Sequence, residues 1–250
     1  MGIPSRITIL AGTLALSLGS WASAYCAEGD GRTDRGSVEQ IVHDYLLEHP
    51  EVLEQALAKV EDLRKKESDA RSRASIVRLR NDLVADHDDP VAGDPKADVT
   101  IVEFFDYGCP YCKQVETSLQ ALLHSDPHLR IVYKEFPILG KNSTYAAKIG
   151  LAAKEQGKYL PLHVAMMTTK GQLTEEVVLH LATDLGLDVS RLQKEAASQE
   201  VEAALKRNNN LAEALAIKGT PAFIIGDELI PGLVEIDSLK EKIAALRKPS

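Results

Sequence analysis

Residues 99–112 read VTIVEFFDYGCPYC, an apolar run that ends in two cysteines separated by two residues. The β-branched and aromatic residues of this run predict a buried strand, and Pro110 suits the first turn of a following helix. Such a helix would direct its free N–H groups and the positive end of its dipole at the sulfur of Cys109. Because this favours the thiolate over the thiol, Cys109 is predicted to be a nucleophile at neutral pH.

Cys112 lies about one turn into the predicted helix, within reach of Cys109. We expect its thiol to attack a mixed disulfide formed at Cys109 and to release the partner, so that the pair cycles between dithiol and disulfide. Two other interpretations of the motif are a static structural disulfide and half of a zinc site. Zinc requires two further Cys or His ligands, whereas the chain offers only Cys26 and no histidine pair at ligand spacing. We therefore predict no structural metal site, and no cofactor beyond a redox-active Cys109–Cys112 disulfide.

The composition describes a globular chain that does not bind nucleic acid. The 250 residues have a mass of 27.2 kDa and are 44% hydrophobic and 26% charged. The formal net charge of -8 and the pI near 5.4 argue against phosphate binding, which needs a net basic face. Aromatic residues make up only 5% of the chain, so stacking platforms for bases are not expected either.

The first 24 residues have the pattern of a secretory signal peptide. One positive charge precedes the apolar run of residues 7–18, and the small residues Ala22 and Ala24 precede the expected cut after Ala24. The run is short for a permanent transmembrane helix, which needs about 20 apolar residues. We therefore predict export to an oxidising compartment, most simply a bacterial periplasm.

Residues 25–36, rich in Gly, Asp and Arg, are predicted to form a disordered tail. The tail contains Cys26, and the large Tyr25 before it argues against lipid attachment. An odd cysteine in an exported protein is a reactive thiol, an intermolecular link or an unused residue, and the last interpretation is favoured.

Residues 37–89 are predicted to be a helical N-terminal oligomerisation domain. Ser37 can cap a first helix, and Pro50 suits the first turn of a second one. A narrow apolar stripe at three-four spacing then follows on an otherwise charged helix. It comprises Leu53, Ala56, Val60, Leu63, Glu67, Ala70, Ala74, Val77, Asn81 and Val84. Since one chain cannot bury such a stripe alone, we expect a homotrimer or homodimer; the alternative is a helix folded back on the next domain.

Residues 90–250 are predicted to be an α/β domain, entered through turn and breaker residues at 87–95. Strands are expected at 98–106 and 129–136, with a helix from Pro110 to about His124 between them. This order is a βαβ unit and implies parallel pairing. A helical insertion is expected at about 142–216, followed by a strand at 217–226, a hairpin return at 227–231 and a helix at 235–247.

The dithiol motif, the helical insertion and Gly219-Thr220-Pro221 before a late strand together resemble the DsbA branch of the thioredoxin superfamily. The resemblance implies a thioredoxin fold with a helical insertion, in which Pro221 is cis and lies against the two cysteines. Thr220, Pro221, Pro110 and Tyr111 would then be substrate-binding residues, with exposed backbone available to a substrate strand.

The resemblance also implies a buried acid six residues before the first cysteine, a position that Glu103 occupies. A carboxyl group there would have a raised pKa and could exchange protons with Cys112. Alternatively, Glu103 faces solvent at the edge of the strand.

Residues 38–63 resemble the N-terminal domain of the ScsC subfamily, named for suppression of copper sensitivity. The resemblance rests mainly on residues 45–53, YLLEHPEVL. It implies a disulfide isomerase that acts on unfolded or misoxidised exported proteins and is kept reduced by a membrane thiol reductase. A monomer would instead be a dithiol oxidase served by a membrane oxidase. A third alternative is copper tolerance, with the thiolates of Cys109 and Cys112 as ligands of Cu(I).

Overall fold

The computed structural model describes residues 34–248 and divides the chain into two compact units, Met1–Ala56 and Leu57–Ser250. The signal peptide predicted for residues 1–24, and Cys26, lie outside the described residues. No helix within 34–248 is both long and apolar enough to cross a lipid bilayer.

The first unit contains helix α1 (Arg35–Glu48) and the beginning of helix α2 (Pro50–Arg78). As expected, Pro50 opens the second helix, where its missing N–H leaves no intrahelical bond unmade. Helix α1 buries none of its residues. Its apolar side chains at Val38, Ile41, Val42 and Tyr45 are all exposed, so this helix has no hydrophobic partner within the described chain.

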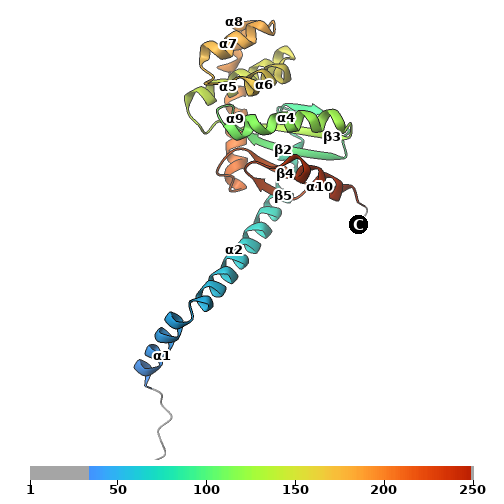
Figure 1. Cartoon of the computed structure of the whole chain (residues 1–250). Coiled ribbons are helices and arrows are strands. Elements are labelled where there is room, and N and C mark those ends of the chain that lie inside the picture. Colours follow the sequence, from blue (N-terminus) through green and yellow to red (C-terminus); the bar gives the residue numbers. More distant parts are fainter. Residues whose placement is uncertain (1–33, 249–250) are drawn as a thin grey trace, which may run out of the picture. The chain divides into compact units, whose positions relative to one another are not determined.

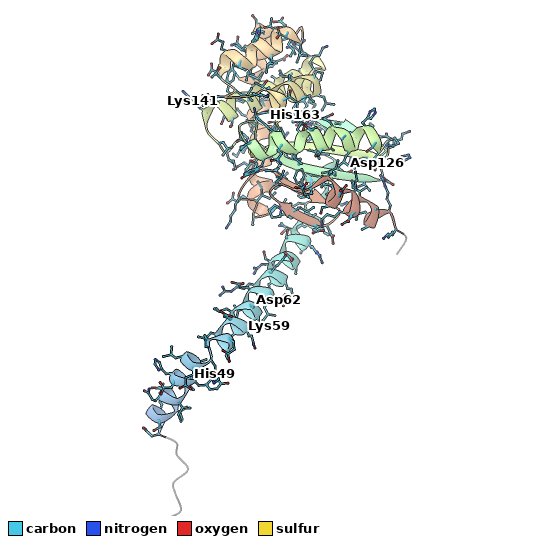
Figure 2. All side chains as sticks on the ribbon, viewed as in Figure 1. His49, Lys59, Asp62, Asp126, Lys141 and His163 are labelled. Carbon is cyan, nitrogen blue, oxygen red and sulfur yellow. The ribbon has the colours of Figure 1, made fainter. Side chains whose placement is uncertain are left out.

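The second unit begins within α2, whose exposed surface carries ion pairs such as Lys59–Asp62 (Figure 2). Helix α2 ends at Arg78, and a short helix α3 (Arg80–Val84) follows after Leu79. Ile76 and Leu83 are buried against Val102 and Phe104 of the β-sheet, whereas Val77 is 62% exposed. The predicted apolar stripe is therefore wrong at the C-terminal end of α2. There Ile76 and Leu83, and not Val77, cover the apolar face of the sheet.

A five-stranded mixed sheet in the order β1-β3-β2-β4-β5 forms the centre of the second unit. Strands β2 (Val99–Phe105) and β3 (Leu129–Glu135) pair in parallel, as the βαβ pattern predicts. Strand β4 (Ala222–Ile225) pairs antiparallel with β2, and β5 (Glu228–Pro231) pairs antiparallel with β4 at the edge of the sheet. Strand β1 (Val91–Gly93) was expected to be a linker, but it pairs with β3 at the other edge.

Helices cover both faces of this sheet (Figure 1). Helices α4 (Pro110–Ser125) and α10 (Ile236–Arg247) lie against one face, where alternate residues of β2 such as Ile101 and Phe105 point. Helices α3 and α9 (Gln199–Ala214) lie on the other face with Val102 and Phe104. The period of two along β2 thus decides which side chains reach α4, the helix that carries the cysteines.

The stretch expected to be a helical insertion is helical and contains no strand between residues 142 and 216. Its helices gather at one end of the sheet (Figure 1). They are α5 (Lys141–Ala153), the 3-10 turn η1 (Lys154–Gln156), α6 (Tyr159–Thr168), α7 (Glu175–Asp184) and α8 (Val189–Ala196), followed by α9. The late strand begins five residues later than expected, because Ile217 closes the end of α9 through a hydrogen bond from its N–H to the carbonyl of Ala212.

Candidate active site

The two cysteines lie at the start of helix α4, which follows the central strand β2. Cys109 is the N-cap residue of α4 in an extended conformation, and Pro110 occupies the first turn. The first-turn N–H groups of the helix are therefore directed at Cys109, as the sequence predicts. Cys109 has 4% of its surface exposed and Cys112 has none. Of the two sulfurs, only that of Cys109 can therefore react directly with a partner protein.

Cys109 is the acidic thiol of the pair. Its pKa is lowered from 9.0 to about 5, chiefly by a hydrogen bond from the Cys112 thiol. Hydrogen bonds from Thr220 and from the backbone N–H groups of Cys112 and Tyr111 act in the same direction, while partial burial opposes them. At neutral pH the group is a thiolate, which is the nucleophilic form.

Cys112 has the opposite character. Burial raises its pKa, and the neighbouring Cys109 and the charge of Glu103 raise it further. The thiol therefore stays protonated until it reacts, and any reaction that consumes it must dispose of a proton.

Thr220 and Pro221 lie directly beside Cys109. The peptide bond between them is cis, as the resemblance implied, and the Cys109 sulfur lies 3.2 Å from the carbonyl oxygen of Thr220, to which it donates when it is protonated. Tyr111 is 56% exposed, and Pro110 is also exposed in the same first turn of α4. A chain approaching Cys109 thus meets the backbone at Thr220 and the exposed side chains of Pro110 and Tyr111.

Glu103 is fully buried on the face of β2 that points toward α4. The alternative that it faces solvent at a strand edge is wrong, because β2 is the middle strand of the sheet. Neither carboxyl oxygen has a hydrogen-bond partner in the described structure. Burial raises the pKa of Glu103 well above 4.5, and the charges of Glu116, Cys109 and Glu135 add to the rise. A buried carboxyl group with a raised pKa therefore lies close to the two cysteines.

Asp106 is a site residue that the sequence did not single out. Its buried carboxylate accepts hydrogen bonds from the N–H of Gly108 at 2.7 Å and from those of Ile138 and Leu139 at 2.8 and 2.9 Å. It thereby fixes the Cys109 loop to the loop after β3, which exposes Ile138 and Leu139. The only early signal was its position three residues before a cysteine in a turn.

A second unpredicted feature is a group of buried polar residues beneath the cysteines, at the junction of α4, β3 and α6. It comprises Tyr107, Glu116, Tyr133, Glu135, Tyr159 and His163, all of them buried. Figure 2 marks His163 on α6. The spacing of Glu116 four residues after Cys112 was the one available signal, since it predicts the same helix face.

The donor set does not fit a zinc site at the cysteines. Among residues 34–248, the one group of three or more candidate ligands consists of Asp86, His87 and Asp88. Arg207 already pairs with both aspartates, at 3.1 and 2.5 Å. The two sulfurs of Cys109 and Cys112 remain the only soft donors at the active site, which is a set that suits Cu(I) but not tetrahedral Zn²⁺.

An acidic thiol at a helix N-terminus, a buried thiol one turn later and a cis-proline against them define the thiol–disulfide oxidoreductases of the thioredoxin fold. Comparison with known families agrees. Residues 100–244 match the model of the DSBA-like thioredoxin domain, and residues 34–67 match that of the copper resistance protein ScsC N-terminal domain. The chain therefore belongs to the DSBA-like thioredoxin domain family.

Solved structures show the same relationship. A thioredoxin-like oxidoreductase from Silicibacter pomeroyi is 43% identical, with 68% of this chain and 99% of that chain covered at a TM-score of 0.67. Salmonella enterica Typhimurium BcfH is 29% identical, with 85% and 96% covered at 0.75. Proteus mirabilis ScsC in a compact conformation is 28% identical, with 85% and 100% covered at 0.64.

Curated relatives match over part of the chain. The Na(+)/H(+) antiporters NhaA 1 of Salinispora arenicola and NhaA 3 of Salinispora tropica are each 28% identical over 63% and 62% of this chain. The chain spans about a quarter of their length, 24% in each case.

Proposed function

We propose that the protein is a periplasmic disulfide isomerase that acts through Cys109 and Cys112 on misoxidised exported proteins. The observation that carries the catalytic part is the contrast between the two thiols, with the pKa of Cys109 lowered to about 5 and that of the buried Cys112 raised. The thiolate of Cys109 attacks a substrate disulfide and forms a mixed disulfide. The substrate thiol set free can then attack another disulfide of the same substrate, or Cys112 can release the substrate in reduced form.

Glu103 would serve the release step as proton acceptor for Cys112. Its position on the face of β2 toward α4, its complete burial and its raised pKa support this role. Thr220, Pro221, Pro110 and Tyr111 would hold the substrate chain, since they surround the accessible side of Cys109.

Isomerisation, rather than oxidation, is supported by the N-terminal helices. Residues 34–67 match the ScsC N-terminal domain, and α1 exposes apolar side chains that a second or third copy would cover. Several active sites in one assembly hold a substrate long enough for a second exchange. Such an isomerase depends on a membrane thiol reductase, because only the reduced form starts the cycle. A monomer would function as an oxidase and depend on a membrane oxidase.

Refolding of a substrate with scrambled disulfides tests the proposal. The reduced protein should restore native pairing, and Cys109→Ser should abolish the effect. Cys112→Ser should accumulate the mixed disulfide, visible as a reducible adduct of protein and substrate. Native pairing that appears only with the oxidised protein and a fully reduced substrate would establish an oxidase instead.

Copper tolerance is a second candidate, favoured by the match to the copper resistance protein ScsC N-terminal domain. The Cys109 and Cys112 sulfurs offer two soft ligands for Cu(I). A tight Cu(I) complex that disappears in Cys109→Ser, in a protein without disulfide reductase activity, would favour this candidate over redox catalysis.

A further inference from the structure

Glu116 lies one helical turn after Cys112, the cysteine that releases the substrate from the mixed disulfide. Cys112 and Glu116 are four residues apart on α4, so they share one face of the helix, one turn from each other. Both residues are buried, with 0% and 1% of their surfaces exposed. Glu103 reaches the same space from β2, and the charge of Glu116 adds to the rise that burial causes in the pKa of Glu103.

A hydrogen-bonded chain leads from Glu116 into the helical insertion. Its Oε2 lies 3.4 Å from Nε2 of His163, whose Nδ1 lies 3.1 Å from the hydroxyl of Tyr107. That hydroxyl donates to Oε1 of Glu135 at 3.0 Å, and the hydroxyl of Tyr159 donates to the same oxygen at 2.8 Å. The other oxygen of Glu116 accepts from the partly buried Gln120 at 2.7 Å, which links the chain to the outer side of α4.

The donors and acceptors of this chain fix where one proton must be. The hydroxyl of Tyr107 has one hydrogen, which it donates to Glu135. It can therefore only accept a hydrogen bond from His163, so Nδ1 of His163 carries a hydrogen. The contact of 3.4 Å between Nε2 and Glu116 becomes a hydrogen bond only when a second proton lies on the imidazole or on the carboxyl group. The pair formed by Glu116 and His163 can therefore hold or give up one proton without breaking any other bond of the chain.

Aromatic rings and titratable groups surround the Glu116–His163 pair. The ring packs against Phe105, Tyr107, Tyr133 and Tyr159, with centroids 4.4 to 5.6 Å away. The titratable groups facing the pair are Glu103 from β2, Cys112 from α4, Tyr133 and Glu135 from β3, Tyr107 from the active-site loop and Tyr159 from α6. Burial raises the pKa of the three tyrosines well above 10.0, so their hydroxyls stay protonated.

We propose that the Glu116–His163 pair is a second proton-exchanging group of the active site, which takes up the proton that Cys112 and Glu103 release and so links the redox state of the dithiol to the protonation of His163. This inference rests on the proposed redox function and extends it to residues outside the sequence motif.

The step balances without a further reactant. Cys112 attacks the Cys109 sulfur of the mixed disulfide, the Cys109–Cys112 bond forms, and the bond to the substrate sulfur breaks. The substrate sulfur leaves as a thiolate, so the substrate disulfide is reduced and the dithiol is oxidised. The proton of Cys112 passes to the carboxylate of Glu103 and on to the pair, and the leaving thiolate takes a proton from water.

The test measures the equilibrium constant for reduction of the protein by glutathione between about pH 5 and 8, the range in which histidine changes charge. Oxidation of the dithiol passes the proton of Cys112 to the pair, so reduction should release a proton from the pair. The logarithm of the equilibrium constant should change with pH by up to about one proton less than the cysteines alone require. His163→Gln preserves a hydrogen-bonding side chain but cannot ionise, and it should remove this difference. His180→Gln, at an exposed histidine of α7, should leave the slope as it is in the wild type.

Ring nitrogen resonances of His163 in the wild-type protein supply a readout that needs no variant to fold. At fixed pH, oxidation should move the Nε2 resonance toward that of a protonated nitrogen, while Nδ1 and the resonances of His180 stay in place. Identical His163 resonances in both redox states, or an unchanged slope in folded His163→Gln, would overturn the inference while leaving the dithiol function intact. A protein whose cysteines show no redox equilibrium with glutathione would overturn both.

Discussion

Cys109 and Cys112 are the same residue type placed in two environments, and their different protonation follows from what surrounds each sulfur. Cys109 receives hydrogen bonds at the open end of α4, and Cys112 is buried one turn further along. The ionisation and the reaction rate of each cysteine can therefore be tested separately.

The thiolate of Cys109 should form with a midpoint near pH 5 in the reduced protein. Its ultraviolet absorbance and its rate of alkylation should both follow that midpoint. The pKa is lower in the folded than in the unfolded chain, so the thiolate contributes stability that is complete above about pH 9 and is lost as the pH falls through about 5. The reduced wild type should therefore gain stability relative to Cys109→Ser as the pH rises through this window. A midpoint near that of a free thiol would contradict the hydrogen bonding described here.

Glu103→Gln should slow the release of substrate by Cys112 by about 10²-fold, the lower end of what a positioned acid–base group contributes. The first attack by Cys109 should keep its rate, because that sulfur is already ionised at neutral pH. Rapid quenching of the mixed disulfide separates the two steps. Glu213→Gln, on the exposed surface of α9, provides the control, and equal release rates in both variants would remove Glu103 from the mechanism.

The sequence predicted residues whose role depends on local order, and it missed those that depend on distant contacts. The positions of Cys109 at a helix start and of Glu103 inside a strand follow from a run of fourteen residues, 99–112. Asp106 acquires its partners 32 and 33 residues away, and Glu116 meets His163 at a separation of 47. No periodicity within one element encodes such contacts.

The elements show the same distinction. The pattern of strands and helices from Asp98 onward predicts β2, α4, β3 and α10 closely, because each has its own apolar period. Strand β1 was missed since three residues between turn signals carry no period, and it exists through pairing with β3. The end of α2 was assigned the wrong apolar face, because the sheet and not a second helix selects Ile76 and Leu83.

Leu83→Ala should destabilise the protein by about 2–5 kcal/mol, the usual cost of a cavity at a fully buried leucine. Val77→Ala, six residues earlier and 62% exposed, should change the free energy of unfolding by less than about 0.5 kcal/mol. Denaturant unfolding followed by circular dichroism gives both values. Similar costs at the two positions would mean that Val77 is buried in an assembly, as the original stripe required.

A buried ion pair fixes the segment between α3 and β1 to the sheet. Lys134 of β3 is fully buried, pairs with Asp89, and donates to the carbonyl of Asp82 at 2.7 Å. Burial raises the pKa of Asp89 from 3.8 to about 6 although Lys134 lowers it, so the cost of desolvation exceeds the attraction between the two charges. The pair is therefore costly to break but cheap to replace.

Asp89→Ala should lower the free energy of unfolding by about 3–5 kcal/mol, because Lys134 is left buried without its counter-charge. The double variant Asp89→Leu with Lys134→Met should regain most of that loss, since it removes both charges together. Urea unfolding at neutral pH compares the three proteins. A double variant as unstable as Asp89→Ala would show that the shape of the site, and not the charge balance, holds this segment.

At the scale of the whole molecule, the question is whether the N-terminal helices assemble. A chain shortened to begin near Asp94 would answer it poorly, because β1, Leu83 and Asp89 belong to the structure of the second unit. A substitution on the exposed surface of α2 leaves those contacts intact. Val60 lies on the apolar side of this helix and is 42% exposed, and Ala58 lies on the opposite side and is exposed too.

Val60→Glu should convert an oligomer into monomers, because a buried charge in a helical seam costs more than the contacts around it supply. Light scattering measures the mass, and Ala58→Glu adds the same charge on the other side of the helix as a control. The monomer should keep its reduction of a simple disulfide, since Cys109 and its partners all lie in the second unit. It should lose most of its activity on scrambled substrates, because the assembled active sites are what convert exchange into isomerisation. Monomers for the wild type and both variants would refute the seam and leave the oxidase as the function that the dithiol supports.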